Sequence, residues 1–450
     1  MTYPDSLSRV AGFLKYLGGG EAIAIKVICG HYEHSGFTGK AVVVRLDSGY
    51  EWVSWEQAQY VPCWNVGGPL FTTEWLETGG TAPAGYNYEP IHDKDLEFSH
   101  PKLLQCSDLH ALVQWDYQLV NTLGKSFLNG TKGRETHAIH PGGYAVRVLE
   151  AFPGMGTYGG RATAWENFEV IFLNPPRLSP VDYLEERVAT FMNLKGDTWD
   201  YVWEASRYCA QKTRPWRYLC EEIPSYPEWS ETIVRIHLRG YPDVFAAFPQ
   251  TNDRFPHHES CGRCDKHHPL VFLWHDYPLW MHWPCSPDRE FVVDRPATPE
   301  DVIDAWTHSS VTSGGPFYDW GREIDWKPKP GDKWHFLYGI APNRDEELCD
   351  LVDAWLNPGA ISCSEDLPVD YDLGQMMYII RGSGKGPIQL TPQRVLVNPL
   401  IRWEKWEGAK PQAVALSEGR RYSVKVEMGG DDLFLSIPGR FDNHLIVELD

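Results

Sequence analysis

Residues 421–437 read RYSVKVEMGGDDLFLSI, and this stretch indicates the fold of the C-terminal end. Tyr422, Val424 and Val426 are apolar, and the residues between them are polar, which is the period of a half-buried β-strand. Residues 429–432, Gly-Gly-Asp-Asp, supply a tight turn before the second apolar run. We therefore predict an antiparallel hairpin here.

Strand-like runs surround this hairpin on both sides. They are Met376–Ile380, Arg394–Val397 and Leu445–Leu449. Several short strands with turn residues between them are typical of a sandwich. The sequence predicts a C-terminal β domain over residues 373–450, built as an antiparallel β-sandwich.

The preceding segment, residues 298–372, is acidic and predicted to be helical. Thr298 with Pro299 supplies a helix start, and Asn343 caps a second helix that stops at Pro358-Gly359. Residues 300–372 contain 16 acidic and 5 basic side chains, a net charge of −11. So many carboxylates cannot all be buried, so we expect an acidic surface.

Three carboxylates of this segment are candidates for catalysis. Asp319, Glu323 and Asp325 lie beside Trp320 and Trp326. Paired carboxylates next to aromatic side chains are what a glycosidase cleft needs, with one acid and one ionised partner. The alternative is a solvated acidic face without catalytic function.

A cluster of metal-ligand residues marks residues 251–297. Cys261, Cys264, His282 and Cys285 have the spacing C-x2-C-x17-H-x2-C. Each two-residue gap lets a tight turn aim both ligands at one ion, and four such ligands suit tetrahedral zinc. The spacing predicts a closed structural zinc site, which leaves no open position for an activated water.

This cluster resembles the first zinc-binding half of a LIM domain and related treble-clef modules. The resemblance implies a zinc module of about 25 residues, with Trp280 as the aromatic residue before the histidine. A nearby histidine could replace one of the four ligands; the candidates are His257, His258, His267, His268 and His275.

The region from 96 to 250 mixes helix and strand patterns. The apolar spacing of residues 109–120, after Ser107, predicts a helix. Further helices are predicted after Ser179-Pro180 and over residues 199–211, and strands over 144–149, 168–173 and 232–238. No regular alternation of strand and helix appears, so we predict an α+β domain.

The N-terminal end reads as a small β-barrel within residues 1–62. Strand-like runs occur at Ala24–Ile28, Ala41–Leu46 and Tyr50–Trp55, with turn residues between them. This succession of strand-like runs and turn residues resembles an SH3-like or KOW-type barrel. Residues 63–95 are rich in Pro and Gly and are predicted to be a linker. The predicted fold class is therefore α+β multidomain: a small N-terminal β-barrel, a mixed middle region with the zinc module, and the C-terminal sandwich.

Composition narrows the class of protein. The 450 residues are 42% hydrophobic and 23% charged, which is typical of a globular chain, and they include 20 tryptophans. The formal net charge of −20 argues against a nucleic-acid binder. We expect no transmembrane helix and no secretory signal. The ten cysteines, three of them in the metal cluster, favour a reducing compartment, either the cytoplasm or the virion of a virus.

These features favour a zinc-stabilised intracellular binding or assembly protein, such as a viral or phage structural component or accessory protein. Its partner would be another protein or further copies of itself, because acidic residues 300–372 could contact the basic stretch 380–411 of the next copy. The first alternative is a glycosidase-like hydrolase that uses the acidic segment. The second is a nucleic-acid-binding accessory protein.

Overall fold

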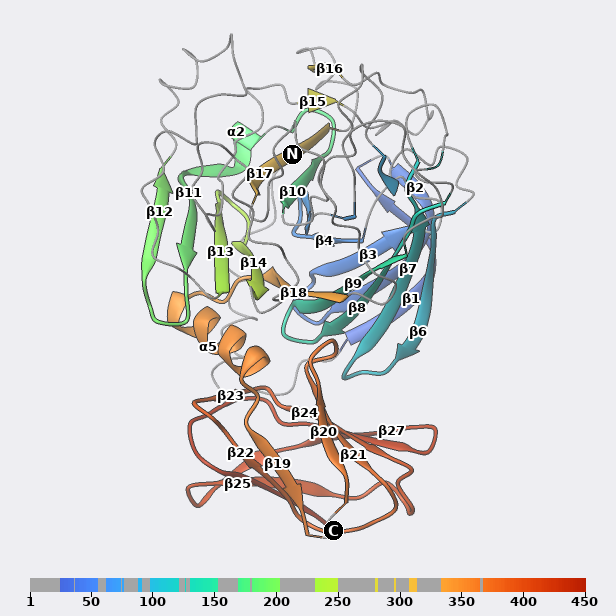
Figure 1. Cartoon of the computed structure of the whole chain (residues 1–450), viewed down its shortest axis with the longest axis vertical. Helices are drawn as coiled ribbons and strands as arrows, with labels where there is room; N and C mark the ends of the chain where they lie inside the picture. The colour runs from blue at the N-terminus through green and yellow to red at the C-terminus, as the bar shows by residue number, and fades with distance from the viewer. Residues whose placement is uncertain are drawn as a thin grey trace.

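The chain is a β-rich multidomain protein (Figure 1). The computed structural model describes residues 25–35, 37–55, 62–73, 75–76, 88–90, 98–120, 126, 130–152, 169–178, 180–202, 231–249, 280–281, 295–296, 307–313, 333–364 and 367–450. Within these residues almost every element is a strand. Every strand pairing among them is antiparallel except that of β21 (Met377–Arg381) with β24 (Leu400–Glu404).

Two large sheets form the N-terminal unit. The first has seven strands in the order β1 (Ile25–His34), β2 (Phe37–Leu46), β3 (Glu51–Trp55), β4 (Cys63–Asn65), β5 (Leu70–Thr73), β10 (Glu169–Asn174) and β17 (Thr307–Ser313). The second has nine strands in the order β12 (Thr198–Val202), β11 (Leu184–Met192), β13 (Glu231–Leu238), β14 (Val244–Pro249), β18 (Lys333–Ile340), β9 (Tyr144–Phe152), β8 (Lys132–His140), β7 (Ala111–Gln118) and β6 (His100–Cys106).

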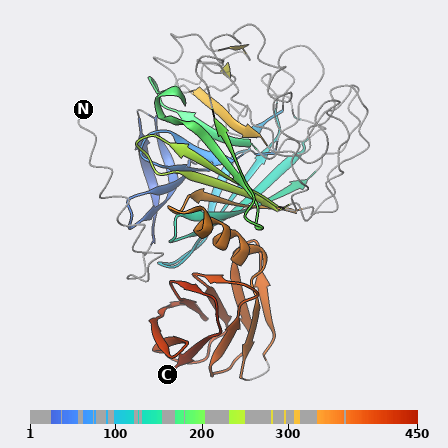
Figure 2. The ribbon, with the colours of Figure 1, turned by 90° about the vertical axis from the view of Figure 1, so that its left-hand side faces the viewer.

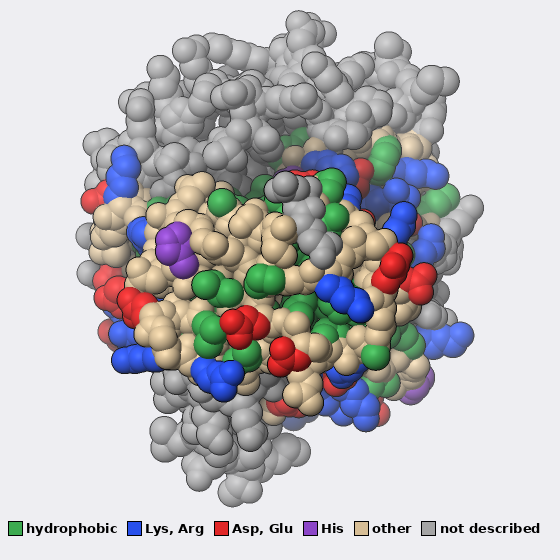
Figure 3. Space-filling view, turned by 90° about the horizontal axis from the view of Figure 1, so that it is seen from below, with side chains coloured by type: hydrophobic (Ala, Val, Ile, Leu, Met, Phe, Trp, Pro, Cys, Tyr) green, Lys and Arg blue, Asp and Glu red, His purple; other side chains and the backbone are tan. Residues whose placement is uncertain are grey.

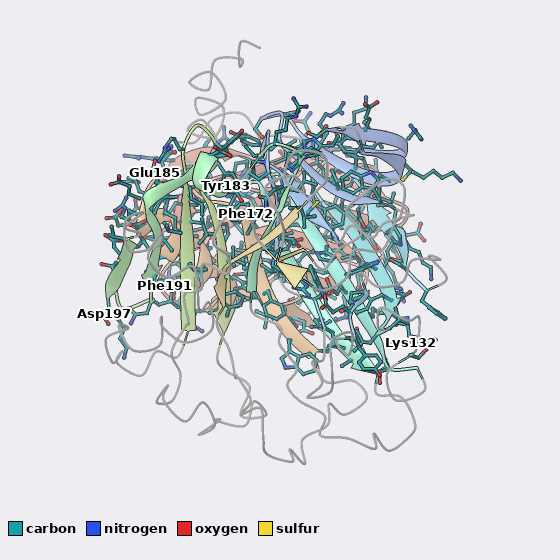
Figure 4. All side chains as sticks on the ribbon, turned by 90° about the horizontal axis from the view of Figure 1, so that it is seen from above. Lys132, Phe172, Tyr183, Glu185, Phe191 and Asp197 are labelled. Carbon is teal, nitrogen blue, oxygen red and sulfur yellow. The ribbon has the colours of Figure 1, made fainter. Side chains whose placement is uncertain are left out.

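The two sheets pack face to face as a sandwich around one apolar core. Strand residues alternate between faces, so in β9 Ala145 and Leu149 point into this core while Tyr144 and Val146 point to the opposite face. Aromatic rings fill the space between the sheets. Phe172 of β10 and Tyr183 belong to this core, with 5.4 Å between their ring centroids, and Figure 4 labels both residues.

The helix α5 (Asp345–Leu356) covers the other face of the nine-stranded sheet. Its buried residues Leu348, Val352 and Trp355 pack in one cluster with strand residues such as Phe245 and Leu337. The same cluster includes Val395 of the C-terminal unit. The helix therefore lies between the two units, as Figures 1 and 2 show.

The C-terminal unit is a smaller sandwich of two five-stranded sheets. One has the order β19 (Ala360–Cys363), β22 (Ile388–Thr391), β30 (Leu445–Leu449), β25 (Ala413–Ser417) and β26 (Arg420–Ser423). The other has the order β20 (Val369–Asp372), β21, β24, β28 (Asp432–Ser436) and β27 (Lys425–Gly429). The short elements are α2 (Pro180–Tyr183) and the pairs β15 (Trp280–Met281) with β16 (Arg295–Pro296) and β23 (Leu396–Val397) with β29 (Arg440–Phe441).

Several predictions at this end of the chain are confirmed in part. Of the hairpin predicted over residues 421–437, the part from Lys425 to Ser436 exists as β27 and β28, whereas residues 420–423 form β26 in the other sheet, so the predicted first strand is broken at Val424. The C-terminal sheets also begin before residue 373, with β19 and β20. The helix predicted after Asn343 exists as α5. Its first turn lies one residue later than predicted, because Arg344 precedes it in an extended conformation and binds Glu347.

The helix predicted after Ser107 is wrong. The segment is β7, in which Ala111, Val113, Trp115 and Tyr117 are buried. The segment adopts the strand conformation and not the helix because these side chains, mostly β-branched or aromatic, fit the core between the sheets. The α+β assignment is corrected accordingly, since the described part contains one long helix. The helix predicted over 199–211 is β12 in its first residues, and the helix predicted from Thr298 lies outside the described residues.

Two further expectations need correction. The helix that begins at Pro180 ends at Tyr183, because β11 follows at once and pairs with β12 and β13. The three N-terminal strands exist, but they do not close into a small barrel. They continue through β4 and β5 into the seven-stranded sheet, where Trp52 and Trp64 are fully buried against the second sheet. No helix of the described residues is long and apolar enough to span a membrane.

Candidate functional site between the two sheets

A set of buried polar side chains crosses the core between the seven-stranded and nine-stranded sheets. In β8 the strand period turns Glu135 and His137 toward the core. In β9 it does the same for Arg147, which lies opposite His137 in the register. Fully buried charged side chains are rare unless they are paired. This set is therefore the candidate site; we call it the inter-sheet polar site.

Glu135 and Arg147 form the ion pair at its centre. Arg147 Nη2 donates to Glu135 Oε1 at 2.6 Å, and Arg147 Nη1 donates to Thr73 Oγ1 at 2.8 Å. Tyr117 adds a hydrogen bond to Glu135 Oε1 at 3.0 Å. Burial on its own would raise the pKa of Glu135, but the Arg147 charge outweighs it and leaves that pKa below its usual value. Glu135 is therefore an ionised carboxylate.

His137 and Tyr338 continue the site away from the ion pair. The indole N–H of Trp52 donates to the Tyr338 oxygen at 2.8 Å, so the Tyr338 hydroxyl is left to donate to His137 Nδ1 at 3.0 Å. The proton of a neutral His137 is then on Nε2, which lies 3.2 Å from Glu135 Oε2 without the alignment of a hydrogen bond. Burial lowers the pKa of His137 and raises that of Tyr338, so both are neutral.

This geometry joins the two sheets. Trp52 and Thr73 come from the seven-stranded sheet, and their partners Tyr338 and Arg147 come from the nine-stranded sheet. Chemically, the site is an ordered series of carboxylate, imidazole and phenol, the groups that carry general acid–base chemistry. Arg147 and Glu135 are 1% and 2% exposed, so in this conformation their charges are compensated by the protein itself.

A second polar cluster lies on the opposite face of the nine-stranded sheet. His237 Nε2 is 2.8 Å from Thr190 Oγ1, and His237 Nδ1 is 3.0 Å from Asp243 Oδ2. Thr190 donates its own proton to Asp200 at 2.5 Å, so both ring nitrogens of His237 face acceptors. Burial raises the pKa of Asp243, but its bonds to His237 outweigh this and lower it. Arg235 links the cluster to Asp345 at the start of α5.

The structure does not describe any of the residues predicted as functional. Cys261, Cys264, His282 and Cys285 lie outside the described residues. The same is true of Asp319, Glu323 and Asp325, and of the histidines named as alternative ligands: His257, His258, His267, His268 and His275.

The expectation of a metal-binding protein is corrected for the described residues, whereas the structural zinc site at Cys261, Cys264, His282 and Cys285 lies outside them and stays a prediction. Across the described part of the chain, no group of three or more His, Cys, Asp or Glu side chains could hold a metal ion. His237 is one of the buried histidines there. Its ring nitrogens contact the Thr190 hydroxyl and the Asp243 carboxylate.

Sequence reasoning missed the inter-sheet polar site. One signal was available: Arg147 interrupts the apolar run 144–149, which was predicted as a strand. A charged residue at an inward-facing position of a strand requires a buried partner. The alternating Glu135 and His137 lie only ten residues or so earlier. Trp52 and Tyr338, by contrast, are 286 residues apart and share no local pattern.

These features define a class, a two-sandwich antiparallel β-protein with a closed polar site in the larger sandwich. Comparison with known proteins gives little more. No known protein family matches the sequence, and no curated protein does. Among solved structures, a galactose 1-epimerase from Lactobacillus acidophilus NCFM is similar at 7% identity and a TM-score of 0.32, over 72% of this chain and 100% of that one.

Proposed function

We propose that the protein is a binding protein that pairs a strand of a partner protein with the open edge of its nine-stranded sheet. The supporting observation is that three of the four large apolar side chains exposed in the described residues lie on edge strands, the fourth being Ile446 of β30. Leu104 in β6, Val202 in β12 and Val369 in β20 each lie on an edge strand. An edge strand offers unpaired N–H and C=O groups, and an exposed apolar side chain beside them favours pairing with another chain.

Of these edges, β12 suits a partner best. β6 contains Pro101 and Lys102 and has a bulge between Leu103 and Gln105, features that block edge pairing. Among the described strands, β12 pairs with β11 alone, and Val202 at its end is 57% exposed.

The charge on β12 indicates the chemistry of the partner. Asp200, which lies 3.6 Å from Arg187 of β11, is the middle residue of this five-residue strand, and two copies paired in register would place one Asp200 against the other. Like charges directly opposite each other destabilise a strand pair. The net charge of −20 likewise repels a second copy and attracts a basic ligand. We infer that the partner segment is extended and alternates apolar with basic residues.

Contacts within the chain also weaken the head-to-tail alternative. Arg394 of the basic stretch binds Asp350 and Asp353 of the same chain, and Arg381 lies 3.4 Å from Asp370. These cations are therefore already neutralised by the acidic segment. Self-assembly through residues 300–372 and 380–411 would have to break such pairs.

A peptide-binding titration tests the proposal. The probe is a fluorescent synthetic peptide that alternates Val and Lys, followed by fluorescence anisotropy on the full chain. We expect binding that weakens with added salt, because the attraction is partly electrostatic. A peptide with Pro at alternate positions should not bind, because it cannot donate the ladder hydrogen bonds.

The variant Val202→Glu should weaken peptide binding about tenfold, the loss expected for about 1.4 kcal/mol of apolar contact. Ile446→Glu is the matched control. Ile446 is also an exposed apolar residue, but β30 is the middle strand of its sheet and has no open edge. Equal binding by the Pro-containing peptide, or equal weakening by both variants, would contradict edge pairing.

A hydrolase remains the second candidate from the sequence, with Asp319, Glu323 and Asp325 as its carboxylates. Its test is release of reducing ends from soluble polysaccharides. Loss of that release in Glu323→Gln, with unchanged unfolding, would favour the hydrolase over the binding protein.

A further inference from the structure

His110 lies at the contact between the two sandwiches, directly before β7. The turn that carries it is fixed by Ser107, whose Oγ accepts the backbone N–H groups of Leu109 at 3.0 Å and His110 at 3.1 Å. Leu109 packs in a small apolar cluster with three residues of the C-terminal unit: Met377, Leu400 and Phe434. The turn is therefore a docking point of one sandwich on the other.

The His110 imidazole is fully buried, and neither of its ring nitrogens has a hydrogen-bond partner. A buried polar group without a partner is costly and calls for an explanation. The ring lies edge-on to His140, with 5.5 Å between the centroids. His140 Nε2 donates to the carbonyl oxygen of Gln375 at 3.1 Å, across the contact. Both histidines are thus part of the junction, and the geometry suits their neutral forms.

Among the described residues, the carboxylates nearest to His110 are already bound to other groups. The nearby cation is Arg402 of β24, which is bound to Asp432 at 2.6 Å. At the rim, the Asp108 carboxylate lies 3.7 Å from Lys425, and Glu427 accepts the Asp108 backbone N–H.

Among the described residues, Tyr144 is a further titratable neighbour, and its ring stacks on that of His140 with 4.9 Å between the centroids. Burial, and after it the proximity of His140 and Arg402, holds the pKa of His110 well below its usual value. Burial likewise lowers the pKa of His140 to about 4, although its bond to Gln375 opposes the shift.

We propose that His110 and His140 make the contact between the two sandwiches acid-sensitive, so that their protonation releases the C-terminal sandwich while both sandwiches keep their strands. A histidine with a lowered pKa in the closed form binds its proton more readily once the contact opens. The closed form therefore has its full stability above about pH 6.5 and loses it as the pH falls from there. Between the pKa values of the open form and those of the closed form, binding of two such protons multiplies the open-to-closed ratio by about a hundredfold for each unit by which the pH falls.

Small-angle X-ray scattering of the full chain from neutral pH to about pH 4 tests this proposal, with far-ultraviolet circular dichroism on the same samples. We expect the radius of gyration to rise over a range in which the β-sheet signal is unchanged. A radius that stays constant, or one that rises only together with loss of the sheet signal, would overturn it.

The variant His110→Phe keeps an aromatic ring and removes the proton site. It should move the opening to lower pH and halve its steepness. His444→Gln is the matched control, because His444 is exposed in the C-terminal sandwich and bonds to Thr391. An unchanged midpoint in His110→Phe would overturn the proposal. If that variant fails to fold, NMR titration of the wild-type histidines decides: His110 and His140 must remain neutral at pH 6.

Discussion

At the scale of single residues, the inter-sheet polar site determines how the larger sandwich responds to mutation. Glu135 and Arg147 are both buried, and each is the main counter-charge of the other. Removing one leaves the other charge buried without compensation, which typically costs about 3–5 kcal/mol. Removing one partner of a solvent-exposed ion pair in the same sheet does not leave a buried charge and costs much less.

The variant Arg147→Met should therefore lower the free energy of unfolding by about 3–5 kcal/mol, measured by urea denaturation. The double variant Arg147→Met with Glu135→Gln should recover part of the loss, because no buried charge remains. Lys102→Ala is the control; Lys102 pairs with Asp116 at the surface, so its loss should cost about 1 kcal/mol or less. A small effect of Arg147→Met would contradict the assigned ion pair.

At the scale of elements, β18 connects the strands that carry the site. It pairs with β14 on one side and with β9 on the other, and it contributes Tyr338. The adjacent Gly339 allows the two backbones to come close. A Cβ atom at this position would lie 2.3 Å from the carbonyl oxygen of Gly143 and 2.6 Å from Tyr144 Cα. Neither backbone atom can move away without breaking the strand pairing.

We therefore expect Gly339→Ala to lower the melting temperature of the larger sandwich by several degrees, because each kcal/mol lost lowers it by about 2 °C in a unit of this size and a backbone clash costs several. Gly30→Ala in β1 is the matched control, because nothing lies within 4 Å of a Cβ atom there. Differential scanning calorimetry distinguishes the two. Equal melting temperatures in both variants would contradict the close approach of β18 and β9.

The elements also differ in how far the sequence predicts them. The strand character of residues 421–437 and helix α5 follow from local patterns, namely alternating residue types and an apolar helical face, but the break at Val424 that places β26 and β27 in different sheets does not. β7 could not be predicted in this way, because Leu109, Leu112 and Val113 fit a helical spacing equally well. The segment is a strand because its side chains pack in the core between the two sheets. The polar site depends on strand register between distant segments, which no local pattern contains.

At the scale of the whole molecule, the helix α5 and its ion pairs connect the two sandwiches. Asp350 of α5 binds both Arg394 and Arg440 of the C-terminal unit, at 3.1 and 2.6 Å. Seen from below, the molecule presents hydrophobic side chains in small separate groups among polar and charged ones (Figure 3). A broad apolar contact between copies is therefore not expected on this face.

We predict that the chain sediments as a monomer at both low and high salt. The net charge of −20 repels further copies, and Arg381 and Arg394 are paired within the chain. Analytical ultracentrifugation over a range of ionic strength tests this prediction. A discrete oligomer that dissociates with salt would instead support head-to-tail assembly through residues 300–372 and 380–411.

Hydrogen–deuterium exchange of β12 with and without the Val-Lys peptide is the most direct measurement of edge pairing. An added strand bonds to alternate residues of the edge it joins, so part of the backbone amides of Thr198–Val202 should become protected when the peptide binds. The amides of β30 should not change. Protection of β12 in the wild type and its loss in Val202→Glu is the predicted result. Unchanged exchange in β12 while the peptide is bound would contradict the proposed function.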